Sequence, residues 1–205
     1  MAVNRRLALG LAAVVASMVL LFEVPSGYFV VATFVATSCM IGAALTLGVA
    51  LRKARPRARP VLIGLASAGV LYFVFYVGAG VVDAYHPFGI TSASESAVYS
   101  LIANPSNPLY LQVLVLLFDS AGFESFFRGV LQQKLQPRFG VGAAPLVAGL
   151  DACIHILTLN PIWVGGTFLT DLAWGLTYRY GRGLQGSFVS HLVWDLAIFV
   201  VHPVG

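Results

Sequence analysis

Three apolar stretches in the C-terminal half of the chain each contain two polar residues that are four positions apart. The three pairs are Glu124 with Arg128, Asp151 with His155, and His191 with Asp195. On a helix, this spacing places both side chains of a pair on one face. Ionisable groups inside a bilayer are costly unless they are paired or hydrated, so such a cluster indicates a functional site.

These residue types favour hydrolysis. A carboxylate and an imidazole, such as Glu124 and His155, can hold a water molecule and remove its proton. A second histidine beside a carboxyl group, such as His191 beside Asp195, can donate hydrogen bonds to a developing oxyanion. Two histidines and one carboxylate are also a common zinc-ligand set. If a divalent metal such as zinc is present, we expect His155 and His191 to bind it. The His-Glu-x-x-His spacing of soluble metalloproteases is absent, so the sequence leaves the choice of cofactor open.

The composition is that of a membrane protein. Apolar residues make up 59% of the 205-residue chain and charged residues only 10%, and the mean hydropathy is +0.87. Soluble domains have about 25% charged residues. We therefore expect an all-α, polytopic transmembrane helix bundle. It would be a multi-pass integral membrane protein, located in the plasma membrane if the source is prokaryotic.

The apolar runs predict seven spans, because crossing a bilayer takes about 20 apolar residues. The predicted spans lie near residues 7–22, 27–50, 61–82, 109–133, 141–159, 162–178 and 184–201. We expect a single membrane domain over residues 1–205. Residues 1–83 would provide scaffold spans, and residues 108–201 would form the core that bears the polar pairs.

The basic residues predict the orientation. Lys and Arg precede the first span and fill the second, fourth and sixth connections, whereas the other connections contain none. This alternation places the N-terminus inside. Basic clusters that flank spans favour contact with membrane lipid and do not indicate nucleic acid as a partner. In the long outer connection, Ser92 and Glu95 form a capping-box pattern that predicts a short interfacial helix.

The polar pairs also resemble the motifs of a known family. The run from Phe123 to Leu131, followed by Arg138-Phe139-Gly140, is similar to the first motif of the CAAX-protease and bacteriocin-processing family of intramembrane endopeptidases. That family carries Glu-Glu-x-x-x-Arg, then Phe-x-x-x-His, then His-x-x-x-Asn or Asp. The corresponding residues here are Glu124, Arg128, His155, His191 and Asp195. The resemblance covers about residues 108–201.

The resemblance implies cleavage of a peptide bond near the membrane, in a membrane-associated or prenylated peptide. It assigns a structural role to Arg128. Two positions depart from the family pattern, because the first Glu is replaced by Phe123 and the Phe before the middle His by Asp151. Asp151 is one carboxylate that can replace the lost base. Asp119, one helical turn before Phe123, is another, and it otherwise supports the site. Glu124 is the third, although it is adjacent to Phe123 and points about 100° around the helix.

Two alternatives to an active protease remain. Phe123 removes the carboxylate that the family resemblance assigns to water activation, which favours a catalytically inactive relative that binds a partner, peptide or lipid in the same pocket. Buried acidic residues in a seven-span chain also suit a proton-linked transporter. Inverted repeats and broken helices, which mark many transporters, are not evident in the sequence.

Overall fold

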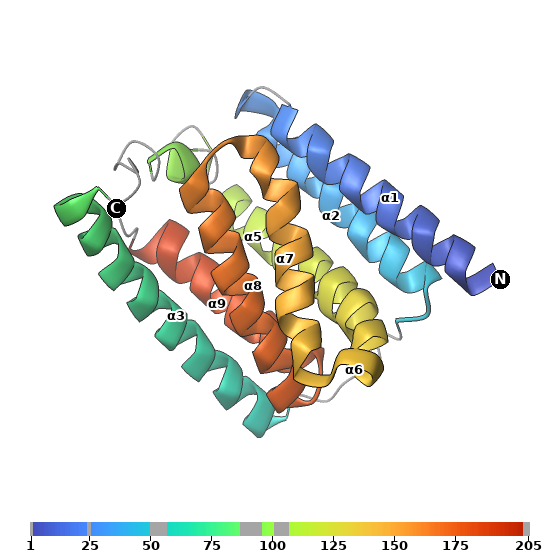
Figure 1. Cartoon of the computed structure of the whole chain (residues 1–205). Coiled ribbons are helices and arrows are strands. Elements are labelled where there is room, and N and C mark those ends of the chain that lie inside the picture. The colour runs from blue at the N-terminus through green and yellow to red at the C-terminus, as the bar shows by residue number, and fades with distance from the viewer. Residues whose placement is uncertain (1, 24–25, 50–56, 87–95, 101–106, 203–205) are drawn as a thin grey trace.

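The structure is a computed structural model that describes residues 2–23, 26–49, 57–86, 96–100 and 107–202. These residues form a helical bundle without a strand (Figure 1). The helices are α1 (Ala2–Glu23), α2 (Phe29–Thr46), α3 (Ala58–Tyr85), α5 (Leu109–Phe123), α6 (Gln133–Phe139), α7 (Ala143–His155), α8 (Pro161–Gly181) and α9 (Leu184–Leu196). Two π-helical segments, Glu124–Gln132 and Ala197–Val201, continue α5 and α9.

The all-helical fold is confirmed, and a helix lies at each of the seven predicted spans. By length and composition, five helical stretches in the described residues are suited to cross a membrane. One of them, residues 109–158, contains two of the predicted spans, and α8 is not among the five. Asp171, Arg179 and several small residues lower the hydropathy of α8. The number of spans therefore stays a prediction. In the long outer connection, residues 96–100 are helical, and the capping-box residues lie outside the described ranges.

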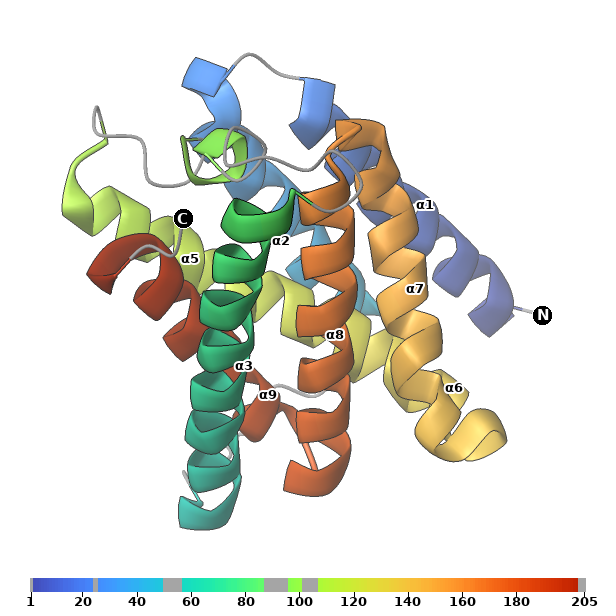
Figure 2. The same ribbon diagram turned by 60° about the vertical axis from the view of Figure 1, so that its left-hand side comes forward.

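The bundle consists of helix pairs arranged around α5 and α9. Helix α1 packs on α2, and α2 packs on α5 and on the π-helical segment that follows it. On the other side, α3 packs on α9, and α7 packs on α8 (Figures 1 and 2). Small residues allow the close approaches, as expected for helices in lipid. At Gly64 of α3, an added Cβ would lie 2.5 Å from the carbonyl oxygen of Gly186.

Two apolar clusters fill the bundle. The first joins α1, α2 and the π-helical segment through Met18, Met40, Phe126 and Phe127. The second joins α3, α8 and α9 through a set of large side chains that comprises Leu71, Trp174, Trp194 and Ile198. Large apolar side chains also cover the outside of α3, including Leu62, Val70 and Phe73, each more than half exposed. An apolar outer face is what a helix in contact with lipid requires.

The basic residues gather at one end of the bundle. The beginning of α3, α6 and the turn from α8 to α9 lie at that end, whereas the end of α3 and the turn from α7 to α8 lie at the other (Figures 1 and 2). Lys134, Arg138, Arg179 and Arg182 are on the segments at the first end. This arrangement agrees with the alternation of basic connections. That this end faces the inside of the membrane stays a prediction.

Candidate active site

A cavity of about 450 Å³ lies within the bundle. Apolar side chains from α1, α2 and α3 line one part of it, including Phe22, Phe29 and Phe75. The ionisable residues that line it are Asp119, Asp151, His155, His191 and Asp195. The structure therefore brings residues from α5, α7 and α9 together at one cavity. Glu124 and Arg128 do not line it and lie behind His191.

His191 lies between two carboxylates. Its Nδ1 is 3.1 Å from Glu124 Oε1, and its Nε2 is 3.4 Å from Asp195 Oδ2. The imidazole also stacks on the indole of Trp174, with ring centroids 3.5 Å apart. All four residues are buried, and the most exposed of them, Trp174, is 5% exposed. The imidazole is thus fixed in position by contacts from three helical segments, and its Nε2 edge faces the cavity side where Asp195 lies.

Behind His191, a buried charge network holds Glu124. Arg128 Nε is 3.7 Å from Glu124 Oε2, and an Nη atom of Arg128 donates a hydrogen bond to Asp171 Oδ1 on α8. Gln132 ties the same π-helical segment to α8 through a 2.7 Å hydrogen bond from its Nε2 to the Gly175 carbonyl. Because all three charged side chains are at most 2% exposed, each depends on the others for compensation of its charge.

Asp171 has a partner that the sequence analysis missed. Among the described residues, Asp171 is the single acidic residue on α8. No basic residue of α8 lies four positions before or after it. The sequence signal that could have predicted this contact is an acidic residue alone in an apolar stretch, because such a residue needs a partner from another helix. Its partner Arg128 had already been paired with Glu124 by spacing, and that pair is also present in the structure.

The second polar pair, on α7, has a defined hydrogen-bond geometry. His155 Nδ1 is 3.0 Å from the backbone carbonyl oxygen of Asp151, and 3.7 Å from its Oδ1. A carbonyl only accepts, so Nδ1 carries the proton and, in the neutral ring, Nε2 is the acceptor. Phe22 of α1 packs edge-on against the imidazole, with centroids 5.0 Å apart. Asp151 is 1% exposed, and its Oδ1 has no hydrogen-bond partner in the described residues.

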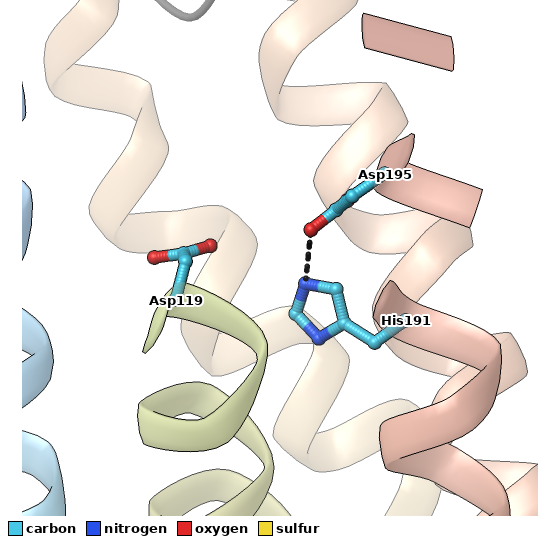
Figure 3. A group of neighbouring side chains, drawn as sticks. All are labelled: Asp119, His191 and Asp195. Atoms are coloured by element: carbon cyan, nitrogen blue, oxygen red, sulfur yellow. Dashed lines mark ion pairs between the residues drawn. The ribbon is translucent and has the colours of Figure 1, made fainter. Parts of the chain in front are cut away.

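Asp119 approaches the same region from α5. It is half-buried and takes part in no hydrogen bond or ion pair within the described ranges. One ligand atom each from Asp119, His191 and Asp195 lie within 4.8 Å of one another (Figure 3). This is the group with metal-ligand geometry in the part of the chain that the structure describes. It differs from the set expected from sequence, because His155 does not belong to it.

Phe123 also lines the cavity. Its ring stacks on Phe127, with centroids 5.2 Å apart, and meets the His191 ring edge-on at 6.0 Å. The side chain at this position therefore lies next to the histidine and contributes an aromatic face to the cavity wall.

This geometry defines a class of protein. It is a membrane-type helix bundle with buried acids and histidines around an internal cavity. Residues 105–197 match the family model described as type II CAAX prenyl endopeptidase Rce1-like. This match agrees with the resemblance of the motifs in this region to the CAAX-protease family, and the chain is an integral membrane protein. The searches of curated proteins and of solved structures found no match.

Proposed function

We propose that the chain is an intramembrane endopeptidase that hydrolyses a peptide bond in a prenylated or other membrane-associated peptide. The observation that carries the proposal is that two histidines line one cavity. His155 has an acceptor nitrogen available, and the imidazole of His191 is fixed in position. The match of residues 105–197 to a CAAX prenyl endopeptidase family supports a protease of this type.

His155 is the proposed general base. Its Nε2 accepts a proton from water while the water oxygen attacks the peptide carbonyl carbon. When the C–N bond breaks, the same nitrogen returns the proton to the leaving amine. The Asp151 carboxylate, 3.7 Å from Nδ1, stabilises the imidazolium between these two steps. In this scheme Asp151 is a positioning residue, and the base role that the family assigns to its first Glu passes to His155.

His191 and Asp195 form the other side of the proposed site. Negative charge that develops on the peptide carbonyl oxygen would be stabilised by the Nε2–H group of His191 in its doubly protonated form, whose positive charge Glu124 and Asp195 balance. Glu124 holds the ring through Nδ1, and Arg128 and Asp171 hold Glu124. Such preorganised groups act strongly because the site excludes bulk water.

The apolar part of the cavity suits the lipid portion of a substrate. Side chains such as Met18, Leu21 and Val74 line it, and none of them offers a hydrogen bond. A prenyl group would be buried against them, while the peptide extends toward the histidines. This separation of apolar and polar walls supports a lipid-modified peptide over a soluble one.

An inactive relative that binds such a peptide is the second candidate. The observation that favours it is Phe123, which places an aromatic ring beside His191 where the family resemblance places a carboxylate. The two candidates share the cavity and differ in whether the bound peptide is cleaved.

The test is a cleavage assay on the purified full chain in lipid vesicles. Farnesylated peptides that end in Cys and three further residues are the substrates, and release of the tripeptide is measured by mass spectrometry. We expect His155→Gln to lower the rate by about 10²–10⁴-fold, the usual contribution of a general base. The matched control is Asp83→Asn, an exposed carboxylate on α3, which should cleave as the parent does.

Unmodified peptides of the same sequence should be cleaved more slowly, because they lack the apolar group. A parent that cleaves no peptide, together with an active Phe123→Glu variant, would overturn the proposal in favour of the inactive relative.

A further inference from the structure

The cavity occupies one half of the bundle. On α3 its lining residues run from Val74 to Val82, in the second half of the helix. On α8 they run from Pro161 to Thr170, in the first half, and also include Trp174. These parts of the two helices lie toward the end of α3 and the turn from α7 to α8 (Figures 1 and 2). The cavity is therefore in the half of the bundle that is away from the basic end.

The cavity wall reaches the outer surface of the bundle at two helices. Its lining residues from α1, α2, α5, α7 and α9 are buried or half-buried. Within the described ranges, the lining residues that are also exposed are Val74, Gly78, Pro161, Gly165 and Leu169. All five are on α3 or α8, and the two helices are neighbours here, because a Cβ added at Gly166 would lie 3.5 Å from the Phe75 ring. The cavity therefore opens sideways, between α3 and α8.

The surface around this opening is apolar. Between Arg59 and Asp83, α3 carries no charged residue, and residues 161–170 of α8 carry none either. Phe73 and Val77 of α3 are 66% and 46% exposed. An extended apolar surface of this kind is typical of contact with lipid. The opening therefore faces the hydrocarbon of the membrane, in the leaflet away from the basic end.

We propose that the substrate of this site is a peptide anchored in the outer leaflet, and that its lipid chain enters between α3 and α8. Basic connections stay inside, which places the half of the bundle that contains the cavity outside. The anchor can then remain in hydrocarbon while the attached peptide reaches His155 and His191, which line the same cavity. The choice of substrate rests on the proposed function, but the direction of entry can be measured without cleavage.

The test measures from which leaflet the cavity is reached, with no enzymatic readout. The probe is an amphiphile with a charged head group and a maleimide at the end of its alkyl chain. The head group holds it in the leaflet to which it is added, because a charge crosses the bilayer centre only at high cost. Spheroplasts of a bacterial host that expresses the full chain receive the probe in the outer leaflet. Inside-out vesicles from the same cells receive it in the inner leaflet.

Two buried threonines of α8 form a matched pair. Thr170 lines the cavity and is 4% exposed. Thr177 is about two helical turns closer to the basic end, is 5% exposed and is not among the lining residues. Each is replaced by Cys in a chain whose own cysteines, Cys39 and Cys153, are replaced by Ser. We expect Thr170→Cys to react at least about tenfold faster in spheroplasts than in inside-out vesicles, and Thr177→Cys to react slowly in both.

Two glycine variants locate the opening. Gly165 and Gly69 each have nothing within 4 Å of an added Cβ, but only Gly165 lines the cavity. Combined with Thr170→Cys, Gly165→Trp should abolish most of the reaction in spheroplasts, because the indole fills the opening. Gly69→Trp should leave the reaction unchanged. A Gly165→Trp chain that reacts as fast as its parent would overturn the route between α3 and α8.

Exposed residues at the two ends of the bundle establish its orientation. A charged maleimide that stays in water should label Asp83→Cys in spheroplasts and Lys134→Cys in inside-out vesicles. The reverse pattern would overturn entry from the outer leaflet. A Thr170→Cys chain that reacts equally well or better in inside-out vesicles, or in neither preparation, would do so as well.

The outcome is separate from that of the proposed function. A chain that cleaves peptides and is labelled from the inner leaflet keeps the protease and overturns the proposed entry. A chain that is labelled from the outer leaflet and cleaves nothing keeps the entry route and overturns the protease.

Discussion

Removal of the Asp171 carboxylate should destabilise the bundle more than any surface change. Asp171→Asn keeps the shape of the side chain and removes the charge that faces Arg128, which is completely buried. Breaking a buried ion pair by neutralising one partner costs about 3–5 kcal/mol. Arg128 would then be balanced only by Glu124, whose nearest contact with it is 3.7 Å, so we expect a loss in this range.

The same change should also disturb His191. Glu124 is drawn toward the uncompensated guanidinium and away from the imidazole, with which it now makes a 3.1 Å hydrogen bond. Stability is measured as the free energy of unfolding in mixed micelles of a mild detergent and dodecyl sulfate, with Asp83→Asn as the matched control. The position of the His191 ring is followed separately, by the change in tryptophan fluorescence that we expect when the ring stacked on Trp174 moves.

A double variant tests whether the cost arises from the unpaired charge. Arg128→Met combined with Asp171→Leu removes both partners, and replacing a buried pair with apolar groups is often neutral. The double variant should therefore lose less stability than the sum of the two single losses, with a coupling of about 1–3 kcal/mol. An Asp171→Asn variant within about 0.5 kcal/mol of the parent, the range of surface substitutions, would refute the reasoning.

Two further predictions concern packing and orientation. Gly64→Ala should lower the free energy of unfolding by about 1–3 kcal/mol, because the new Cβ overlaps the Gly186 carbonyl oxygen. Gly69→Ala on the same helix has nothing within 4 Å and should not destabilise, and equal losses in both variants would contradict this explanation. For orientation, reporter fusions after Arg55 and after Ser96 should be found on opposite sides of the membrane, with the first inside. Both reporters on one side would rule out the predicted topology.

The fold was predictable because each helix has a local signal. Apolar runs of sufficient length predicted where the helices lie, and glycine, proline and basic residues mark the connections between them. The three polar pairs were predictable for the same reason, since residues four apart share a helix face. Each pair is in contact in the structure, at 3.7, 3.7 and 3.4 Å.

The contacts between helices were not predictable in detail, because they depend on how each helix is rotated and tilted. The sequence paired His155 with His191 as metal ligands, whereas the geometry groups Asp119 with His191 and Asp195. No sequence pattern predicted the π-helical segment Glu124–Gln132, which carries Glu124 and Arg128. Such segments are rare and often occur at functional sites, where they redirect side chains.

The two positions at which the sequence analysis expects departures from the family pattern lie at one place in the structure. Phe123 and Asp151 are on different helices and both line the same cavity. The interpretation that a carboxylate lost from α5 is replaced by one on α7 stays a prediction, and the structure places Asp151 next to His155. Asp151 lies on the Nδ1 side of the His155 ring. If the chain is an active protease, this position favours a mechanism in which histidine takes the proton of water and the carboxylate only stabilises the charged ring. The consequence is that Asp151→Asn should slow cleavage less than His155→Gln does, whereas a carboxylate that accepted the proton itself would make the two losses equal.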